Sequence, residues 1–241
     1  MFHALGRDDW PPFSVEPSCR PVVETIRTSM GKAINYNYLI HEGPGTNAVL
    51  IDPSWEKQRI LALMDSLSLK LDAILVTHSH PDHIDLAESI SDARGCPVII
   101  SEEEVRASTF RATNMELCHP FGYRCGRMII RPILTPGHTA GCMCYEIGGN
   151  LFTGDVLFAE GCGLCKDTAS AYKMFDSLTK LKQALRPDTK IYPGHSYGQR
   201  PGLLFSRILR DNIYLQFRNK EEFASFRMRK HPNPARLFDF K

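Results

Sequence analysis

Long apolar runs are missing from this chain of 241 residues. None approaches the roughly eighteen residues that a membrane span requires, so we expect no membrane partner. The first twenty residues contain two aspartates and three prolines and no continuous apolar segment, which counts against a secretory signal. The 8 cysteines could form a set of disulfides, but in a chain of this length without a secretory signal they indicate reduced thiols. The sequence therefore predicts a cytoplasmic protein with reduced thiols.

A large charge of one sign is equally absent. The net charge of +2 at pH 7 gives no reason to expect a nucleic acid partner. Hydrophobic residues make up 43% and charged residues 23% of the chain, close to the averages for globular proteins, which excludes an intrinsically disordered chain. A chain of this length buries a substantial core. We expect one domain over residues 1–241.

The charge that is present is unevenly distributed along the chain. Residues 207–241 contain nine Lys and Arg against four Asp and Glu, a net charge of +5, whereas residues 1–206 carry −3. We expect this basic tail to be partly helical, with a helix over 207–216. Two interpretations of the tail stay open. Its aromatic residues pack on the core beneath solvated charges, or it forms a docking surface for an acidic partner.

Apolar spacing and turn residues predict two related halves built from strands and helices. Strands are expected at residues 22–29, 34–41, 48–52, 73–76, 128–134, 143–147, 151–153 and 190–192, and helices at 56–68, 86–93 and 171–185. In each half one strand ends near an aspartate (Asp52, Asp155) and another ends near a histidine (His78, His195). Because ligands gather just past the carboxyl ends of strands in open α/β architectures, we expect a site where these ends meet.

Metal-ligand residue types are most densely clustered in the segment His78-Ser79-His80-Pro81-Asp82-His83. Alternate residues of an extended segment point the same way, so His78 and His80 can contact one cation. Asp82 and His83 follow a proline and can turn toward a second position. A single histidine is more often structural than a ligand, but four such residues within six positions favour a metal site.

Three further candidate ligands each follow a glycine. They are His138, Asp155 and His195. Glycine permits a tight turn that aims the next side chain at a shared point. The remaining histidines lack such surroundings, and we expect them to be structural or on the surface; they are His3, His41, His119 and His231.

The segment of residues 78–83 and the order of the later candidate ligands resemble the metallo-β-lactamase superfamily. Phe152-Thr153-Gly154-Asp155, followed by Gly161-Cys162-Gly163 and Pro193-Gly194-His195, is similar to its glyoxalase II branch. The resemblance covers about residues 21–200. It implies an α/β fold, the αβ/βα sandwich, with two mixed sheets flanked by helices.

The resemblance also implies how the ligands are shared between two divalent ions. One ion is expected on His78, His80 and His138, and the other on Asp82, His83 and His195. Asp155 would bridge the two, so that Asp82 and Asp155 are the expected catalytic residues, and Asp52 would orient the ligands from behind. These ligands suit zinc, with iron or manganese as alternatives.

Departures from the glyoxalase II pattern bear on the substrate. Leu164 and Lys166 stand where that branch has the Lys and Tyr that hold glutathione, whereas Tyr197 keeps the branch's tyrosine two residues after the last histidine. We therefore expect Lys166 and Tyr197 to contact the substrate. The short basic tail replaces the glutathione-binding domain of that branch, which counts against glutathione.

The tail resembles a second group more closely. Phe226-Arg227-Met228-Arg229 and residues 237–241 are similar to the hydrolases encoded with bacterial trans-acyltransferase polyketide synthases. That resemblance implies a thioester hydrolase acting on acyl groups of a phosphopantetheine carrier protein, whose acidic surface would dock on Arg227, Arg229 and Lys230. Hydroxyacylglutathione hydrolysis and an iron persulfide dioxygenase with a single metal remain the alternatives.

Cysteine pairs at close spacing offer one more interpretation. Cys142-x-Cys144 and Cys162-x-x-Cys165 have no matching pair elsewhere in the chain. We expect these four residues to be packing thiols of the core. A separate zinc or redox site is the alternative.

Overall fold

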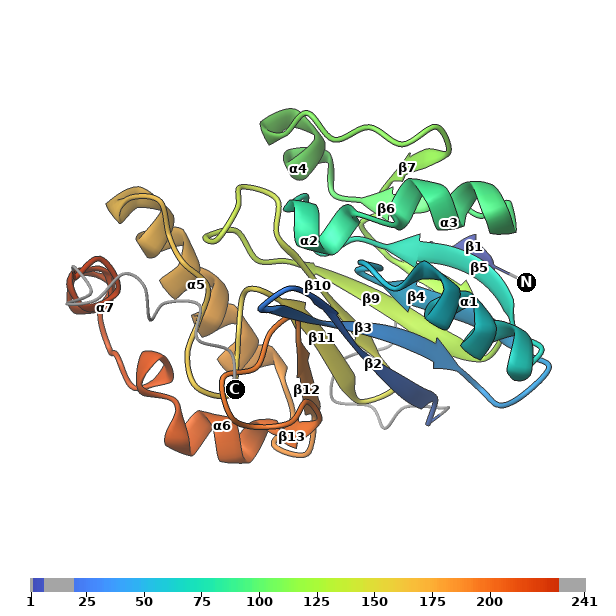
Figure 1. Cartoon of the computed structure of the whole chain (residues 1–241). Coiled ribbons are helices and arrows are strands. Elements are labelled where there is room, and N and C mark those ends of the chain that lie inside the picture. The colour runs from blue at the N-terminus through green and yellow to red at the C-terminus, as the bar shows by residue number, and fades with distance from the viewer. Residues whose placement is uncertain (1, 7–19, 230–241) are drawn as a thin grey trace.

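Two β-sheets packed face to face form the centre of the molecule (Figure 1). The computed structural model describes residues 2–6 and 20–229. The seven-stranded sheet contains, in spatial order, β1 (Phe2–Ala4), β8 (Tyr123–Cys125), β9 (Met128–Leu134), β10 (Met143–Ile147), β11 (Asn150–Gly154), β12 (Lys190–Pro193) and β13 (Leu203–Leu204). The six-stranded sheet contains β2 (Val22–Met30), β3 (Ala33–His41), β4 (Asn47–Ile51), β5 (Lys70–Leu75), β6 (Val98–Ile100) and β7 (Met115–Leu117).

Both sheets combine parallel and antiparallel pairs. Strands β4 to β7 run parallel, while β2 and β3 join them as an antiparallel hairpin. In the other sheet only β11 and β12 pair in parallel. The parallel strands bring their carboxyl ends to one edge of each sheet, which is where the predicted ligands follow.

Helices cover the outer face of each sheet. They are α1 (Lys57–Ser66), α2 (Pro81–Ile84), α3 (Ala87–Arg94), α4 (Glu102–Ala107), α5 (Thr168–Ala184), α6 (Phe205–Asp211), the short 3-10 helix η2 (Ile213–Leu215) and α7 (Lys220–Arg227). Ile60 and Met64 of α1 and Ile90 of α3 pack on the six-stranded sheet. Met174 of α5 and Phe223 of α7 belong to the core on the outer side of the seven-stranded sheet. This arrangement is the αβ/βα sandwich that the sequence predicts.

A third core lies between the two sheets. Tyr38 and Val49 of one sheet meet Ile130, Tyr145 and Phe152 of the other, and all five are almost completely buried. Burial of apolar surface stabilises the fold by about 25 cal/mol per Å². No helix among residues 2–6 and 20–229 is both long and apolar enough to cross a membrane.

The predicted elements and the observed ones differ mainly where elements are short. Strands β1, β6, β7, β8 and β13 and helices α2 and α4 are additional to the prediction. The single helix expected over 207–216 is wrong, because α6 ends at Asp211 and η2 starts at Ile213. Between them, the Asn212 side chain accepts a hydrogen bond from Tyr214 N at 2.9 Å and donates to the carbonyls of Phe158 and Gly161. An asparagine that makes such bonds with the backbone interrupts a helix.

Candidate metal centre

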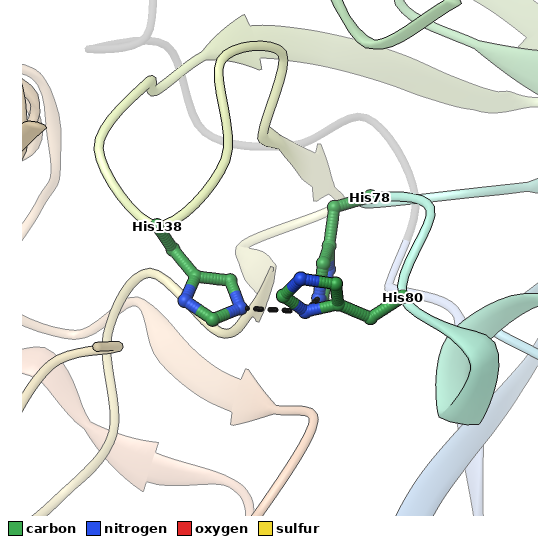
Figure 2. Close-up of side chains that lie close together, drawn as sticks. All are labelled: His78, His80 and His138. Carbon is green, nitrogen blue, oxygen red and sulfur yellow. Dashed lines mark hydrogen bonds between the residues drawn. The ribbon is translucent and has the colours of Figure 1, made fainter. Parts of the chain in front are cut away.

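Three histidines converge at the carboxyl edge of the sheets. His78 and His80 follow β5, and His138 lies in the loop between β9 and β10. Figure 2 shows their rings pointing toward one another from these two loops. His80 Nδ1 lies 3.0 Å from His78 Nε2 and 2.9 Å from His138 Nε2. Three ring nitrogens thus face a common point.

The opposite ring nitrogens have partners that fix the tautomers. His138 Nδ1 donates to the Leu164 carbonyl at 2.8 Å. His78 Nδ1 lies 3.1 Å from Thr77 Oγ1, which donates its own proton to Asp52 at 2.6 Å. A neutral imidazole that donates from one nitrogen carries a lone pair on the other. The lone pairs of these histidines therefore face inward, where a bound cation would relieve their repulsion.

A second set of donors lies beside the first. His83 is in α2 and His195 follows β12, while Asp82 precedes His83 in α2. His195 Nε2 is 3.3 Å and His83 Nε2 is 3.9 Å from Asp82 Oδ2. The outer nitrogens again have acceptors, since His195 Nδ1 lies 2.9 Å from the Ile34 carbonyl and His83 Nδ1 lies 2.8 Å from Asp52 Oδ2. This set can also hold a cation.

Asp155 lies between the two sets of donors. Its Oδ2 is 3.5 Å from His138 Nε2, and its Oδ1 is 3.5 Å from the Nε2 atoms of both His83 and His195. Asp155 Oδ1 and His83 Nε2 are buried and have no hydrogen-bond partner. Unpartnered buried polar atoms are costly, and a divalent cation would satisfy both. The structure thus brings together all seven residues that the sequence predicts as ligands.

Glycines leave room for this cluster. A Cβ added to Gly194 would lie 2.5 Å from His83 Cε1. A Cβ on Gly163 would lie 2.0 Å from the Asp155 carbonyl oxygen, far inside van der Waals contact. Gly163 and Gly194 therefore need to be glycine, because the Asp155 backbone and the His83 ring approach them so closely.

The side chains of the cluster have pKa values that are shifted in different directions. Burial, followed by repulsion from His83, holds the pKa of His78 well below its ordinary value. Burial opposes protonation of His195 as well, but the Asp155 charge outweighs it and raises the pKa of His195 to about 10. The same balance raises the pKa of His83 well above its ordinary value. Burial would raise the pKa of Asp82, yet its hydrogen bond with His195 and the charge of His83 lower it to about 2.

Two buried carboxylates hold the cluster from behind. Asp52 is the residue expected in this role, and its Oδ1 accepts a hydrogen bond from Thr77 N at 2.7 Å in addition to its bonds with His83 and Thr77 Oγ1. Glu104 in α4 is not predicted by the sequence. It accepts from Ser79 N at 2.9 Å and from Thr139 Oγ1 at 2.6 Å, and so joins the two loops that carry the three histidines.

A cavity of about 660 Å³ opens beside the cluster. His80, Asp82, His138, Asp155 and His195 line it, and the rest of its wall is formed by Met30, Ala33, Trp55, Phe158, Glu160, Gly161, Cys162, Gly163, Leu164, Tyr197, Tyr214 and Arg227. Tyr197 thus lies where a substrate contact is expected. Lys166 lines a second pocket of about 520 Å³, which shares His80 with the first.

The part of the chain that carries these donors matches a known family. A family model described as the metallo-beta-lactamase superfamily matches residues 31–120 and 124–195. The chain belongs to the metallo-beta-lactamase superfamily. The matched residues include every donor described above.

Relatives within this superfamily have informative names. The chain is 42% identical to "Probable polyketide biosynthesis zinc-dependent hydrolase BaeB" of Bacillus velezensis, over 91% of this chain and 97% of the relative. It is 39% identical, over the same shares, to "Probable polyketide biosynthesis zinc-dependent hydrolase PksB" of Bacillus subtilis. A hydroxyacylglutathione hydrolase of Brucella ovis is 35% identical over 78% of this chain and 72% of its own length. Among solved structures, ETHE1 from Myxococcus xanthus has a TM-score of 0.76 and 29% identity, covering 90% of this chain and 95% of its own.

The tail residues expected to dock a carrier occupy different positions. Arg227 is partly buried in the cavity wall. Arg229 is exposed, with its guanidinium 3.5 Å from the centre of the Phe226 ring. Lys230 and residues 237–241 lie outside the described residues.

Other reactive side chains near the cluster have structural surroundings. Gly194-His195-Ser196-Tyr197-Gly198 has the Gly-x-Ser-x-Gly pattern of serine hydrolases, but the next helix, α6, begins only at Phe205 and the Ser196 hydroxyl donates to the Gln199 carbonyl. It is therefore not the strand-to-helix elbow of a nucleophilic serine.

The paired cysteines also have surroundings that favour packing. Cys142, Cys144 and Cys162 are buried in the core and Cys165 packs against it. All four are free thiols. No group of candidate metal donors within the described part of the chain includes a cysteine.

Proposed function

We propose that the chain is a zinc-dependent hydrolase that cleaves acyl thioesters in polyketide biosynthesis. The observation that carries this proposal is the position of Asp155, one carboxylate facing both sets of donors at the end of an open cavity. The names of the relatives from the two Bacillus species support the metal, the hydrolysis and the pathway.

Two ions are proposed, divided as the donors are. The first would be held by His78, His80 and His138, the second by Asp82, His83 and His195, and both by Asp155. Such ions would supply a water of lowered pKa and stabilise the charge that develops on the carbonyl oxygen. The protein's own part is to hold Nε2 or Nδ1 lone pairs inward and to keep the Asp155 carboxylate ionised, as its pKa, well below the ordinary value, indicates.

A thioester suits the cavity. The leaving thiol has a pKa of roughly 8.5, so it departs with little help from a general acid. Met30, Trp55 and Phe158 give much of the wall an apolar surface for an acyl chain. Leu164, whose side chain is 44% exposed at the wall, offers no charge to glutathione. These features favour a phosphopantetheine-linked acyl group over acyl-glutathione as the substrate.

The deciding experiment is a hydrolysis screen on protein whose metal content has been measured. Acyl-N-acetylcysteamine, acyl-glutathione and acyl carrier protein thioesters carrying one common acyl group would be compared. We expect two ions per chain and the highest kcat/KM on the carrier-bound thioester. The highest kcat/KM on acyl-glutathione would instead establish hydroxyacylglutathione hydrolysis. One iron per chain with oxygen uptake would establish the persulfide dioxygenase, and no turnover of any thioester would overturn the proposal.

A further inference from the structure

One cationic side chain lines the cavity far along the sequence from the metal donors. Arg227 is in the last turn of α7 and is partly buried. Apart from the histidines, no other basic residue lines the cavity within the described part of the chain. The family model ends at residue 195, so this residue is not part of the matched superfamily core.

Aromatic packing fixes α7 in the position that brings Arg227 to the cavity. Phe223 of α7 is fully buried, and its ring centre lies 5.7 Å from those of both Phe175 and Tyr214. Phe226 packs 5.4 Å from Tyr214 and 5.1 Å from Phe217. A side chain on such an anchored turn is held in place before a ligand arrives, which lowers the entropy cost of binding.

The Arg227 guanidinium is only partly satisfied. One of its terminal nitrogens donates to the Tyr214 hydroxyl at 3.0 Å. Its Nε is buried and has no hydrogen-bond partner. Arg227 takes part in no ion pair with a described carboxylate. Besides Asp82 and Asp155, the described cavity wall contains one carboxylate, that of Glu160, which accepts a hydrogen bond from Gln199 N at 2.7 Å.

The groups nearest to Arg227 cannot neutralise it. The thiols of Cys162 and Cys165 lie beside it, and burial raises the pKa of both, so they stay protonated at neutral pH. The guanidinium also acts on Tyr197, whose pKa is raised first by burial and then by the Asp155 charge. Arg227 and five of the metal donors line the same cavity of about 660 Å³, so that one small substrate can contact both.

We propose that Arg227 binds an anionic group of the substrate, a carboxylate or a phosphate, while the thioester carbonyl lies at the metal centre. A guanidinium donates N–H bonds to either anion, and the Tyr214 hydroxyl engages only one of the terminal nitrogens of Arg227. The anion can lie on the acyl side, as in a dicarboxylic acyl group, or on the thiol side, as in the phosphate of phosphopantetheine. This inference rests on the proposed thioester hydrolysis and specifies its substrate class.

Two matched pairs of small thioesters test the inference on the metal-loaded full chain. The first pair is glutaryl- and pentanoyl-N-acetylcysteamine, two five-carbon acyl groups that differ in a terminal carboxylate. The second is pentanoyl-phosphopantetheine and pentanoyl-pantetheine, which differ in the phosphate. We expect the wild-type protein to prefer the anionic member of one pair by about tenfold or more in kcat/KM, through KM. The pair that shows the preference identifies the side on which the anion lies.

Variants assign that preference to Arg227. Arg227→Gln should abolish the preference by raising KM for the anionic member of the pair far more than for the uncharged member. Arg227→Lys, which keeps the charge without the planar fork, should retain only part of it and remains informative if the glutamine variant does not fold. Arg218→Gln removes an exposed charge of the same region that does not line the cavity, and it should leave the preference intact.

Binding separates this inference from the proposed reaction. Calorimetric titration with phosphopantetheine and pantetheine, and with glutaric acid monoamide and pentanamide, needs no turnover. Absence of turnover of the uncharged thioesters would contradict thioester hydrolysis, while an anion preference in binding that Arg227→Gln removes would still support the inference. No anion preference in either pair, or one that Arg227→Gln leaves unchanged, would overturn it.

Discussion

At the scale of single residues, the metal centre depends on which atom of each side chain is already engaged. The outer nitrogens of His83, His138 and His195 lie within 2.8–2.9 Å of protein oxygens, which leaves one inner nitrogen of each for a cation. Asp155 alone faces both sets of donors. Removing it should therefore affect both proposed ions at once.

Asp155→Ala should lower kcat by roughly three orders of magnitude and reduce the metal content. Cys162→Ala and Cys165→Ala should keep the metal content of the wild type, because their thiols pack against the core. Metal content by mass spectrometry and thioester turnover would be measured side by side. If the cysteine variants lost metal and Asp155→Ala did not, the ligand assignment would be wrong.

Glu104 gives a second prediction at this scale. Glu104→Gln replaces an acceptor oxygen by a donor where Ser79 N and Thr139 Oγ1 both need an acceptor, so we expect metal affinity to fall about 10- to 100-fold. Glu103→Gln is the matched control, since Glu103 is exposed on the same helix. Competition with a chromophoric chelator would measure both affinities. Equal affinities for the two variants would remove Glu104 from the support of the site.

The protonation states of the candidate ligands give a third prediction, which concerns the metal-free protein. Because Asp155 raises the pKa of His195 to about 10 and raises that of His83, these two histidines carry protons at neutral pH. His78 and His80 have lowered pKa values and do not. A cation must displace protons from His83 and His195, so its affinity for these two residues rises with pH through the neutral range. His78 and His80 require no such displacement.

Calorimetry in buffers of different ionisation enthalpy would count the protons. We expect about two protons to be released when His83 and His195 take up a cation, and none from His78 and His80 when a cation binds there. Equal release for both equivalents of zinc would contradict this protonation pattern.

At the scale of elements, the ends of strands and the glycine turns deliver the donors to one place. Gly163 shows how little room is left, because an added Cβ would lie 2.0 Å from the Asp155 carbonyl. Gly163→Ala should destabilise the protein by about 1–3 kcal/mol and reduce the metal content. Gly161→Ala is the control, as its Cβ would make an ordinary 3.4 Å contact with Tyr214. Thermal unfolding that is the same for both variants would contradict the steric argument.

Sequence pattern was sufficient for the longer elements and for the donors. The apolar stripe that includes Ile60 and Met64 predicts α1, and the β-branched run before His78 predicts the buried strand β5. Strands of three residues such as β7 and β8 have too few positions for a pattern, since pairing with distant neighbours determines them. The role of Glu104 could not be predicted from the sequence for a similar reason. It stands in a run of three glutamates at a helix start, and only the tertiary fold buries it.

At the scale of the whole molecule, charge is divided between the body and the tail. Residues 207–241 carry +5 and residues 1–206 carry −3. An acidic carrier protein would be attracted to the tail, and attraction between exposed charges is screened within about 8 Å at physiological ionic strength. We expect kcat/KM for a carrier-bound thioester to fall as salt rises, while that for a free N-acetylcysteamine thioester stays nearly constant. Parallel salt dependence for the two substrates would leave the tail without a docking role.

Two parts of the chain form the cavity wall, and this division bears on how substrate specificity can evolve. All seven candidate ligands lie within residues 78–195, inside the stretch shared with the superfamily, whereas Tyr197, Tyr214 and Arg227 come from the segment beyond it. The shared stretch would carry the reaction, and the segment after residue 195 would add its own contacts with the substrate. A lineage can then exchange its closing segment and acquire new substrates without disturbing the metal donors. The same boundary, just after His195, is where a designer would graft the closing segment of another member to redirect the enzyme.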